Sequence, residues 1–125
     1  MSRKVENPYS GFKDLIIWKR SIRFVKIIYE VTKSFPKEEI YGLTSQLRRA
    51  SISIPSNIAE GSRRGSQKEF RNFLRIAFAS GAEMETQLEI AAVLGYIDNA
   101  KYKDILHEII EIQKMLNSFI KNMPI

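Results

Sequence analysis

The chain has 125 residues, of which 44% are hydrophobic and 27% are charged, and its net charge is +6 at neutral pH. These values are typical of one globular domain that folds without crosslinks. The absence of cysteine excludes disulfides, thiolate metal sites and cysteine nucleophiles. No uncharged run is long enough to span a bilayer, and no apolar signal segment follows Arg3 and Lys4. We therefore expect a cytoplasmic protein without membrane contact.

Positive charge is concentrated in the first two thirds of the chain. Residues 1–39 carry a net charge of +4, residues 40–81 carry +5, and residues 82–125 carry −3. Such asymmetry indicates an anionic partner, or a contact between the basic part of one subunit and the acidic part of another. A mildly basic protein with neither kind of contact is the plain alternative.

Apolar residues recur at intervals of three and four over most of the chain, and glycines and prolines separate these periodic segments. We predict a flexible tail over residues 1–11 and one domain over residues 12–125. The expected helices span about residues 14–34, 41–60, 66–94 and 99–122. Four helices with short connections predict an all-α, up-down-up-down four-helix bundle.

Residues typical of helix ends support this division. Ser66 and Glu69 form a capping-box pattern, and Asp98 is a typical N-cap. Gly95 is expected to end the third helix. Gly61 is expected to end the second helix in the left-handed conformation that glycine adopts freely.

The second helix contains an alternating run and a proline. The alternation over residues 51–54 fits a strand, but the run is short and lies within a longer stripe of helical spacing. Pro55 removes one helical hydrogen bond and pushes against the preceding turn, so we predict a helix kinked at Pro55. Because the residue before proline disfavours the helical conformation, a full interruption at Ile54 is the alternative.

The first helix has apolar residues over about half of its circumference. This arc is wider than one side of a small bundle requires, so we expect the excess to contact another subunit. The opposite side carries Lys19, Arg23 and Lys26. These side chains form a basic ridge that indicates either phosphate contact or a solvated face.

The densest basic cluster covers the second connection and the start of the third helix. It consists of Arg63, Arg64, Lys68, Arg71 and Arg75. The last three share a helix face by their spacing, and the first two precede a helix N-terminus, where backbone amides attract anions. Arginine matches phosphate geometry, so we interpret the cluster as a nucleic-acid-binding surface, which the basic ridge would extend. The alternatives are subunit pairing and plain solvation.

A second arginine pair lies within the second helix. Arg48 and Arg49 are flanked by apolar residues, and Glu85 and Glu89 are spaced one helical turn apart on the third helix. We predict structural ion pairs between these two sets, which would fix the register of the two helices at a desolvation cost. Phosphate contact is the alternative for the arginines.

No residue pattern indicates catalysis. His107 is the only histidine, and its pairing with Asp104 lacks the second pair and the additional carboxylates of a di-iron bundle site. The chain has no glycine-rich phosphate loop. We therefore predict no metal, no cofactor and no enzymatic activity.

Several segments together resemble a known bacterial family. They are residues 42–50 (GLTSQLRRA), 53–61 (SIPSNIAEG), 12–15 (FKDL) with Trp18, 35–39 (FPKEE), 85–91 (ETQLEIA) and 94–96 (LGY). The family is named after a protein encoded in intervening sequences of 23S ribosomal RNA genes, and the accessory variability determinants of diversity-generating retroelements are its relatives. The resemblance covers roughly residues 12–116. It implies a small up-down bundle that assembles as a pentamer, with nucleic-acid contact and no catalytic residues.

The leading hypothesis is a non-enzymatic, oligomeric accessory protein that binds nucleic acid, with RNA favoured over DNA. Self-association follows from the apolar arc of the first helix, and a ring-like homopentamer follows from the resemblance alone. The alternative is a scaffold whose main partner is another protein, such as a reverse transcriptase in the retroelement relatives.

Overall fold

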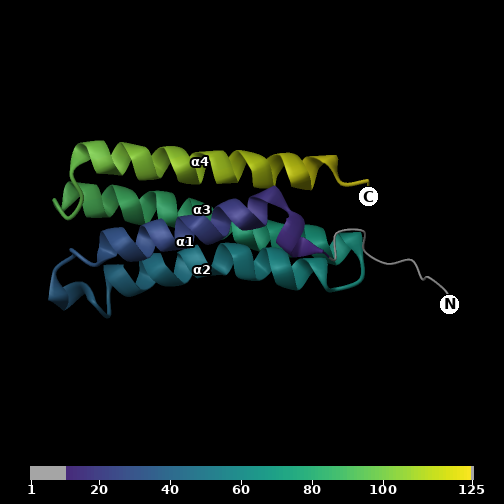
Figure 1. Ribbon diagram of the computed structural model, residues 1–125, viewed down its shortest axis with the longest axis horizontal. Helices are drawn as coiled ribbons and strands as arrows, with labels where there is room; N and C mark the ends of the chain where they lie inside the picture. Colours follow the sequence, from purple (N-terminus) through teal and green to yellow (C-terminus); the bar gives the residue numbers. More distant parts are fainter. Residues whose placement is uncertain (1–10, 125) are drawn as a thin grey trace.

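The computed structural model describes residues 11–124 and consists of four long helices in up-down-up-down order (Figure 1). They are α1 (Ile16–Thr32), α2 (Leu43–Ser62), α3 (Gln67–Val93) and α4 (Asn99–Asn122). Short 3₁₀ turns, Phe12–Asp14 and Lys37–Glu39, precede α1 and α2. Residues 11–124 contain no strand, which confirms the predicted all-α class. The predicted tail, residues 1–11, lies outside the described residues except for Gly11.

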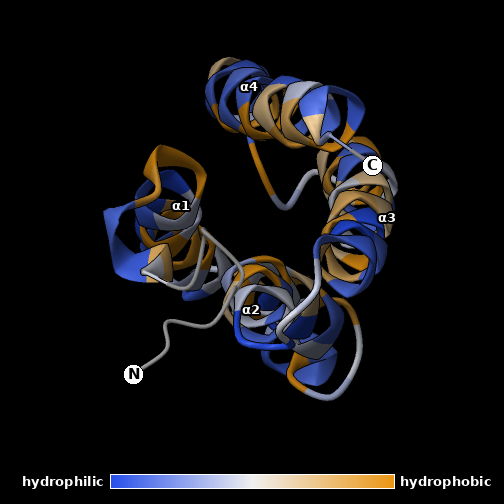
Figure 2. Ribbon diagram, turned by 90° about the vertical axis from the view of Figure 1, so that its right-hand side faces the viewer, coloured by the Kyte–Doolittle hydropathy of each residue, from blue (hydrophilic) through white to orange (hydrophobic). Residues whose placement is uncertain are grey.

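The helices occupy the corners of a quadrilateral, with α1 diagonally opposite α3 (Figure 2). The contact between α2 and α3 is the most extensive in the bundle, and that between α1 and α4 is the least extensive of the four neighbouring pairs. Along residues 11–124, no helix combines the length and the apolar character that crossing a membrane requires. The bundle is therefore built around one close helix pair, with an outer helix on each side of it.

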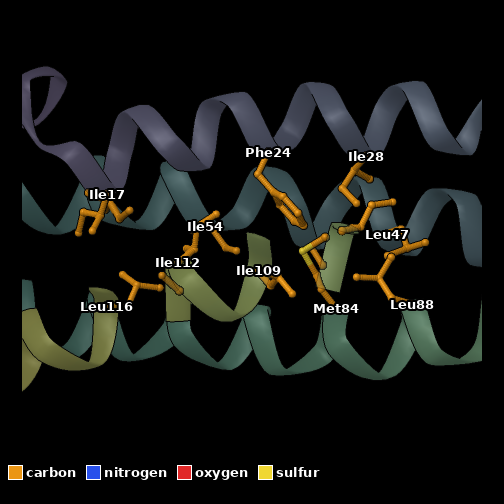
Figure 3. Packing of buried hydrophobic residues seen from close by; sticks show 14 of the residues in the cluster. Ile17, Phe24, Ile28, Leu47, Ile54, Met84, Leu88, Ile109, Ile112 and Leu116 are labelled. Carbon is orange, nitrogen blue, oxygen red and sulfur yellow. The ribbon is translucent and has the colours of Figure 1, made fainter. Parts of the chain in front are cut away.

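Apolar side chains from all four helices meet in one core (Figure 3). The core includes Ile17, Phe24, Ile28, Leu47, Ile54, Met84, Leu88, Ile109, Ile112 and Leu116. Only part of the apolar arc of α1 enters it. The rest of the arc lies along the edge between α1 and α2, where Trp18 and Val25 are half-buried and Ile22 is 42% exposed. The wide apolar arc therefore exceeds what the core of one chain covers.

Helix α2 continues through Pro55, which is buried within it. The alternating residues 51–54 lie in the same helix, so neither the strand nor the full interruption is present. Proline has no backbone N–H, and one carbonyl of the preceding turn therefore lacks its helical donor. Packing of Ile54 and Ile58 into the core on both sides of the proline stabilises the helical path.

Glu39 ties together the two connections at one end of the bundle. Its carboxylate accepts a hydrogen bond from the backbone N–H of Leu43 (3.0 Å) and another from the Tyr96 hydroxyl (2.9 Å). These two donors stabilise the ionised form and lower the pKa of Glu39, the Leu43 N–H having the larger effect. The start of α2 is thereby held to the connection between α3 and α4.

Side chains cap the starts of α3 and α4, and a glycine ends α3, as predicted. Ser66 caps α3 by accepting from the Glu69 N–H (3.1 Å), and Asp98 caps α4 by accepting from the Lys101 N–H (2.8 Å). Gly95 follows α3 with a φ of +79°, and the Tyr96 N–H returns to the carbonyl of Ala91 (2.8 Å). This pattern is a Schellman motif, in which glycine supplies the left-handed residue.

Gly61 does not end α2 in the left-handed conformation, so this prediction is wrong. Gly61 lies inside α2, and its φ is not positive; the left-handed residue of this connection is Gly65, with a φ of +91°. A Cβ at Gly61 would lie 2.6 Å from Cβ of Phe73 and 2.9 Å from Cδ1 of Phe70. Glycine is required here because the end of α2 approaches the start of α3 too closely for any side chain.

Small residues maintain this close approach further along the bundle. The hydroxyls of Ser53 on α2 and Ser80 on α3 are 2.8 Å apart and share a hydrogen bond. On the other side of α3, Gly81 leaves room for the buried side chain of Gln113 from α4, whose Nε2 donates to the carbonyl of Phe78 (2.8 Å). Small side chains at these positions thus allow close packing of α3 against both of its neighbours.

The predicted ion pairs of Arg48 and Arg49 are not formed. Arg48 points to α1, where its Nε donates to Oγ1 of Thr32 (2.9 Å) and its guanidinium lies 4.5 Å from the ring centre of Tyr29. Arg49 is exposed and has no ion pair with a described residue. Spacing on a helix indicates which residues share a face, but it does not say which neighbouring helix that face contacts.

The interhelical ion pair of the bundle instead joins α1 to α4. Arg20 forms a bidentate pair with Glu108, with Nε–Oε2 and Nη2–Oε1 distances of 3.1 and 2.8 Å. Both side chains are half-buried, and the Glu108 hydrogen bond raises the pKa of Arg20. The pair therefore strengthens the least extensive of the neighbouring helix contacts.

We predict that Gly61→Ala lowers the free energy of unfolding by roughly 1–3 kcal/mol, because the added methyl group would force α2 away from α3. Urea denaturation followed by circular dichroism measures this effect. Helix propensity alone would favour alanine by about 1 kcal/mol. An equal or higher stability of the variant would therefore contradict the close approach at Gly61.

Arg48→Ala is expected to lower the free energy of unfolding by roughly 1–3 kcal/mol, because it removes the hydrogen bond to Thr32 and the contact with Tyr29. Arg49→Ala is the matched control, since it makes the same chemical change one residue away on an exposed side. Its effect is expected to stay within about 0.5 kcal/mol. Equal losses in the two variants would show that the contact with α1 is unimportant.

Candidate nucleic-acid interface

The basic cluster begins in the short connection between α2 and α3, at the end of the bundle where α1 starts (Figure 1). Gly65 reverses the chain in its left-handed conformation, and Ser66 then caps α3. Because the connection is so short, Arg63 and Arg64 are held close to the first turn of α3. Helix N-termini favour anions at such a position.

Arg63 and Arg64 point to different parts of the bundle. The Arg63 guanidinium lies 5.1 Å from the ring centre of Phe12, which precedes α1. The Arg64 guanidinium lies 4.8 Å from the ring centre of Phe73 on α3. Both arginines are exposed, and each has its planar group over an aromatic ring. Such stacking orders the side chain, and the N–H groups at the edge of the guanidinium can still donate to an oxygen ligand.

Arg64 is partly neutralised within the chain. Its Nη2 lies 3.3 Å from Oε2 of Glu60, and its Nε lies 3.9 Å from Oε1 of Glu69. The capping-box pattern predicts that Glu69 caps α3, but its carboxylate faces Arg64, and only the Ser66 half of the capping box is present. Arg64 therefore has less free charge to offer an anion than an arginine without acidic partners would have.

Lys68, Arg71 and Arg75 supply the uncompensated charge of the cluster. Lys68 and Arg75 are exposed and have no ion pair with any residue in the range 11–124. Arg71 is half-buried, and its Nε is buried without a hydrogen-bond partner. Three adjacent cations without an acidic partner on one helix face form a site suited to phosphate oxygens. We call these three residues the α3 basic face.

The basic ridge of α1 does not extend this face on a single chain. Lys19, Arg23 and Lys26 are exposed and have no ion pair with a described residue. However, α1 and α3 lie at opposite corners of the bundle, and their backbones do not come close to each other (Figure 2). On a single chain the basic ridge and the α3 basic face therefore lie on non-adjacent helices, and their joining into one surface stays a prediction.

A polar groove between α2 and α3 was missed by the sequence analysis. It has a volume of about 460 Å³, and its lining includes Gln46 and Arg49 from α2 and Glu83 and Gln87 from α3. Tyr41, which precedes α2, lies at its edge and is 94% exposed. The groove could have been found only by pairing residues 46–53 with residues 80–87, and helical periodicity alone does not reveal that pairing.

The single histidine of the chain and its neighbouring aspartate lie on α4. His107 and Asp104 are exposed on α4. Within residues 11–124, no group of three or more histidine, aspartate or glutamate side chains is arranged to hold a metal ion. The basic surfaces and the polar groove are therefore the candidate binding sites of this chain.

Comparison with known proteins supports the resemblance found in the sequence. The chain is similar to a protein of unknown function from the S23 ribosomal protein family of Bacteroides thetaiotaomicron, with a TM-score of 0.77 and 29% identity. That similarity covers 86% of this chain and 100% of the other. No curated protein matches the chain. A family model described as 23S rRNA-intervening sequence protein matches residues 13–118, and the chain therefore belongs to the 23S rRNA-intervening sequence protein family.

Proposed function

We propose that this protein is a non-enzymatic, oligomeric accessory protein that binds nucleic acid, RNA in preference to DNA, through phosphate contacts. The α3 basic face carries the proposal, because its three cations have no acidic partner among the described residues. The family description refers to 23S rRNA, and the similar structure comes from a ribosomal protein family. These descriptions favour RNA.

Binding of this kind contacts the phosphate backbone of the nucleic acid and does not depend on its base sequence. Lys68, Arg71 and Arg75 would each hold a phosphate oxygen, and Arg63, stacked on Phe12, would add an ordered guanidinium at the end of the bundle. Each phosphate neutralised releases counterions, so the affinity should fall steeply with salt concentration. Several copies of the surface on one assembly would add avidity.

The apolar groove between α1 and α2 supports self-association. Its volume is about 390 Å³, and its apolar lining consists of Phe12, Trp18, Ile22, Val25, Ile52, Pro55 and Ala59. The basic ridge of α1 lies on the same helix, and the last third of the chain is acidic. We therefore propose that the acidic part of a second copy covers this groove in a head-to-tail contact that closes into a ring. Five subunits in that ring are what the family resemblance implies.

A scaffold for a protein partner is the second candidate function. The end of α3 exposes three neighbouring apolar side chains, those of Ile90, Val93 and Leu94, which are 43, 75 and 53% exposed. Such a patch is typical of a protein contact. Binding through it would tolerate salt, whereas phosphate binding would not, so the salt dependence of binding separates the two functions.

The nucleic-acid proposal predicts that Lys68→Gln/Arg71→Gln/Arg75→Gln weakens RNA binding at least about tenfold and reduces the salt slope by roughly two to three. Fluorescence anisotropy with structured RNA, single-stranded RNA and duplex DNA over a range of salt concentrations measures both quantities. The wild-type protein is expected to bind RNA more tightly than DNA.

The matched control is Lys101→Gln/Lys103→Gln/Lys121→Gln, which removes three exposed charges from α4. Each triple variant lowers the net charge from +6 to +3. The α4 variant is expected to keep its affinity within about twofold, because loss of net charge alone acts weakly through a screening solution. Equal losses in the two variants, or no binding of the wild type at low salt, would contradict a site at the α3 basic face.

The oligomer proposal predicts that Ile22→Glu/Ile52→Glu converts the ring into monomers of 14.5 kDa, because it places charges in the apolar groove. Light scattering gives the mass, and circular dichroism checks that the helices persist. Ile76→Glu/Ile90→Glu is the control, since those side chains are similarly exposed on α3, at 48 and 43%. Dissociation of the control alone would place the subunit contact on α3 instead.

A further inference from the structure

The polar groove between α2 and α3 is lined by side chains of both helices. Its lining includes Ala50 and also Ser53 and Ser80, whose hydroxyls already bond to each other (2.8 Å). The walls carry Arg49 from α2 and Glu83 from α3, which face the same groove but form no ion pair with each other or with another described residue. A cation and a carboxylate are therefore both free for a ligand.

Gln87 provides the second and independent observation. Its side chain lines the groove, and the residue is only 7% exposed. Its Nε2 reaches Oε1 of Gln46 at 3.5 Å, but its own Oε1 is buried and has no hydrogen-bond partner. A buried acceptor without a donor is costly, so a ligand N–H placed in the groove would be favoured.

Tyr41 adds an aromatic surface at the edge of the same groove. It is 94% exposed, the highest value among the large hydrophobic side chains of residues 11–124. Nothing in that part of the chain forms a hydrogen bond with it or stacks on its ring. An aromatic ring beside a groove is a platform on which a nucleic-acid base can stack.

We infer that this groove holds one unstacked base of a single-stranded RNA, and that it favours a base with an amino group. The amino group of adenine, cytosine or guanine has two N–H bonds and would donate one to Oε1 of Gln87 and one to the carboxylate of Glu83, whereas uracil offers only the single N–H of its ring. The base would stack on Tyr41, and Arg49 would hold a neighbouring phosphate. This inference rests on the proposed function, because the basic surfaces bind the phosphates of the RNA strand to which the bound base belongs.

The polar walls also argue against a helix as the occupant. A groove that receives a helix is lined by apolar side chains, into which the apolar face of the partner packs. Here the walls present two amides and two opposite charges. The volume of about 460 Å³ lies within the range of small-ligand sites and is ample for a single base.

The test compares the binding of adenine, cytosine and uracil oligoribonucleotides of equal length to the full-length protein. The wild type is expected to bind the adenine and cytosine oligomers roughly tenfold more tightly than the uracil oligomer. Gln87→Leu is expected to reduce this preference to within about twofold, because it removes the acceptor for the amino group of adenine and cytosine. Light scattering of each variant checks that the assembly is intact.

Tyr41→Ala and Tyr41→Phe form a second pair, and neither should disturb folding because the ring is so exposed. Tyr41→Ala removes the ring and is expected to weaken binding of all three oligomers at least about fivefold, whereas Tyr41→Phe retains the stacking surface and the affinity. The same loss in Tyr41→Phe, or a change of mass in Tyr41→Ala, would overturn the pocket. The latter result would identify the groove as a subunit contact.

Two further outcomes separate the pocket from the proposed function. Equal, salt-sensitive binding of all three oligomers that Gln87→Leu does not alter would overturn the pocket and leave the phosphate-binding function intact. Absence of binding to every oligomer at low salt would overturn both.

Discussion

The close approach of α2 and α3 sets the positions of the other elements. Gly61 is surrounded by Phe70 and Phe73, and the paired hydroxyls of Ser53 and Ser80 maintain the contact halfway along the helices. With this pair fixed, α1 packs beside α2 and α4 beside α3, and the backbones of α1 and α3 stay apart on opposite sides of the core. The connection between these two helices is short, so Arg63 and Arg64 lie close to the start of α3. The polar groove lies between the same two helices.

The helices themselves could be predicted from the sequence, because their signals are local. The spacing of apolar residues, the caps Ser66 and Asp98 and the terminating Gly95 each depend on a few neighbouring residues, and the structure contains all of them. Gly61 shows where local reasoning fails. A left-handed cap and a close interhelical contact both require glycine, and only the position of α3 distinguishes them.

The candidate site was less predictable, for the same reason. Arg48 and Arg49 are adjacent in sequence, but one contacts α1 and the other borders the groove between α2 and α3. The basic residues that cluster in sequence diverge in space, since Arg63 stacks on Phe12 and Arg64 on Phe73. Helical periodicity gives the face of a residue but not its partner, which depends on how the helices are arranged around the core.

The Arg20–Glu108 pair has a consequence for the order in which the bundle forms and opens. It joins residues 88 positions apart, whereas the other large helix contacts lie between neighbours in the chain. Closing so long a loop costs more chain entropy than forming a hairpin of consecutive helices. The seam between α1 and α4 is therefore expected to close last during folding. It should also be the first to open, so backbone amides of α1 should exchange with solvent sooner than those of α2 and α3.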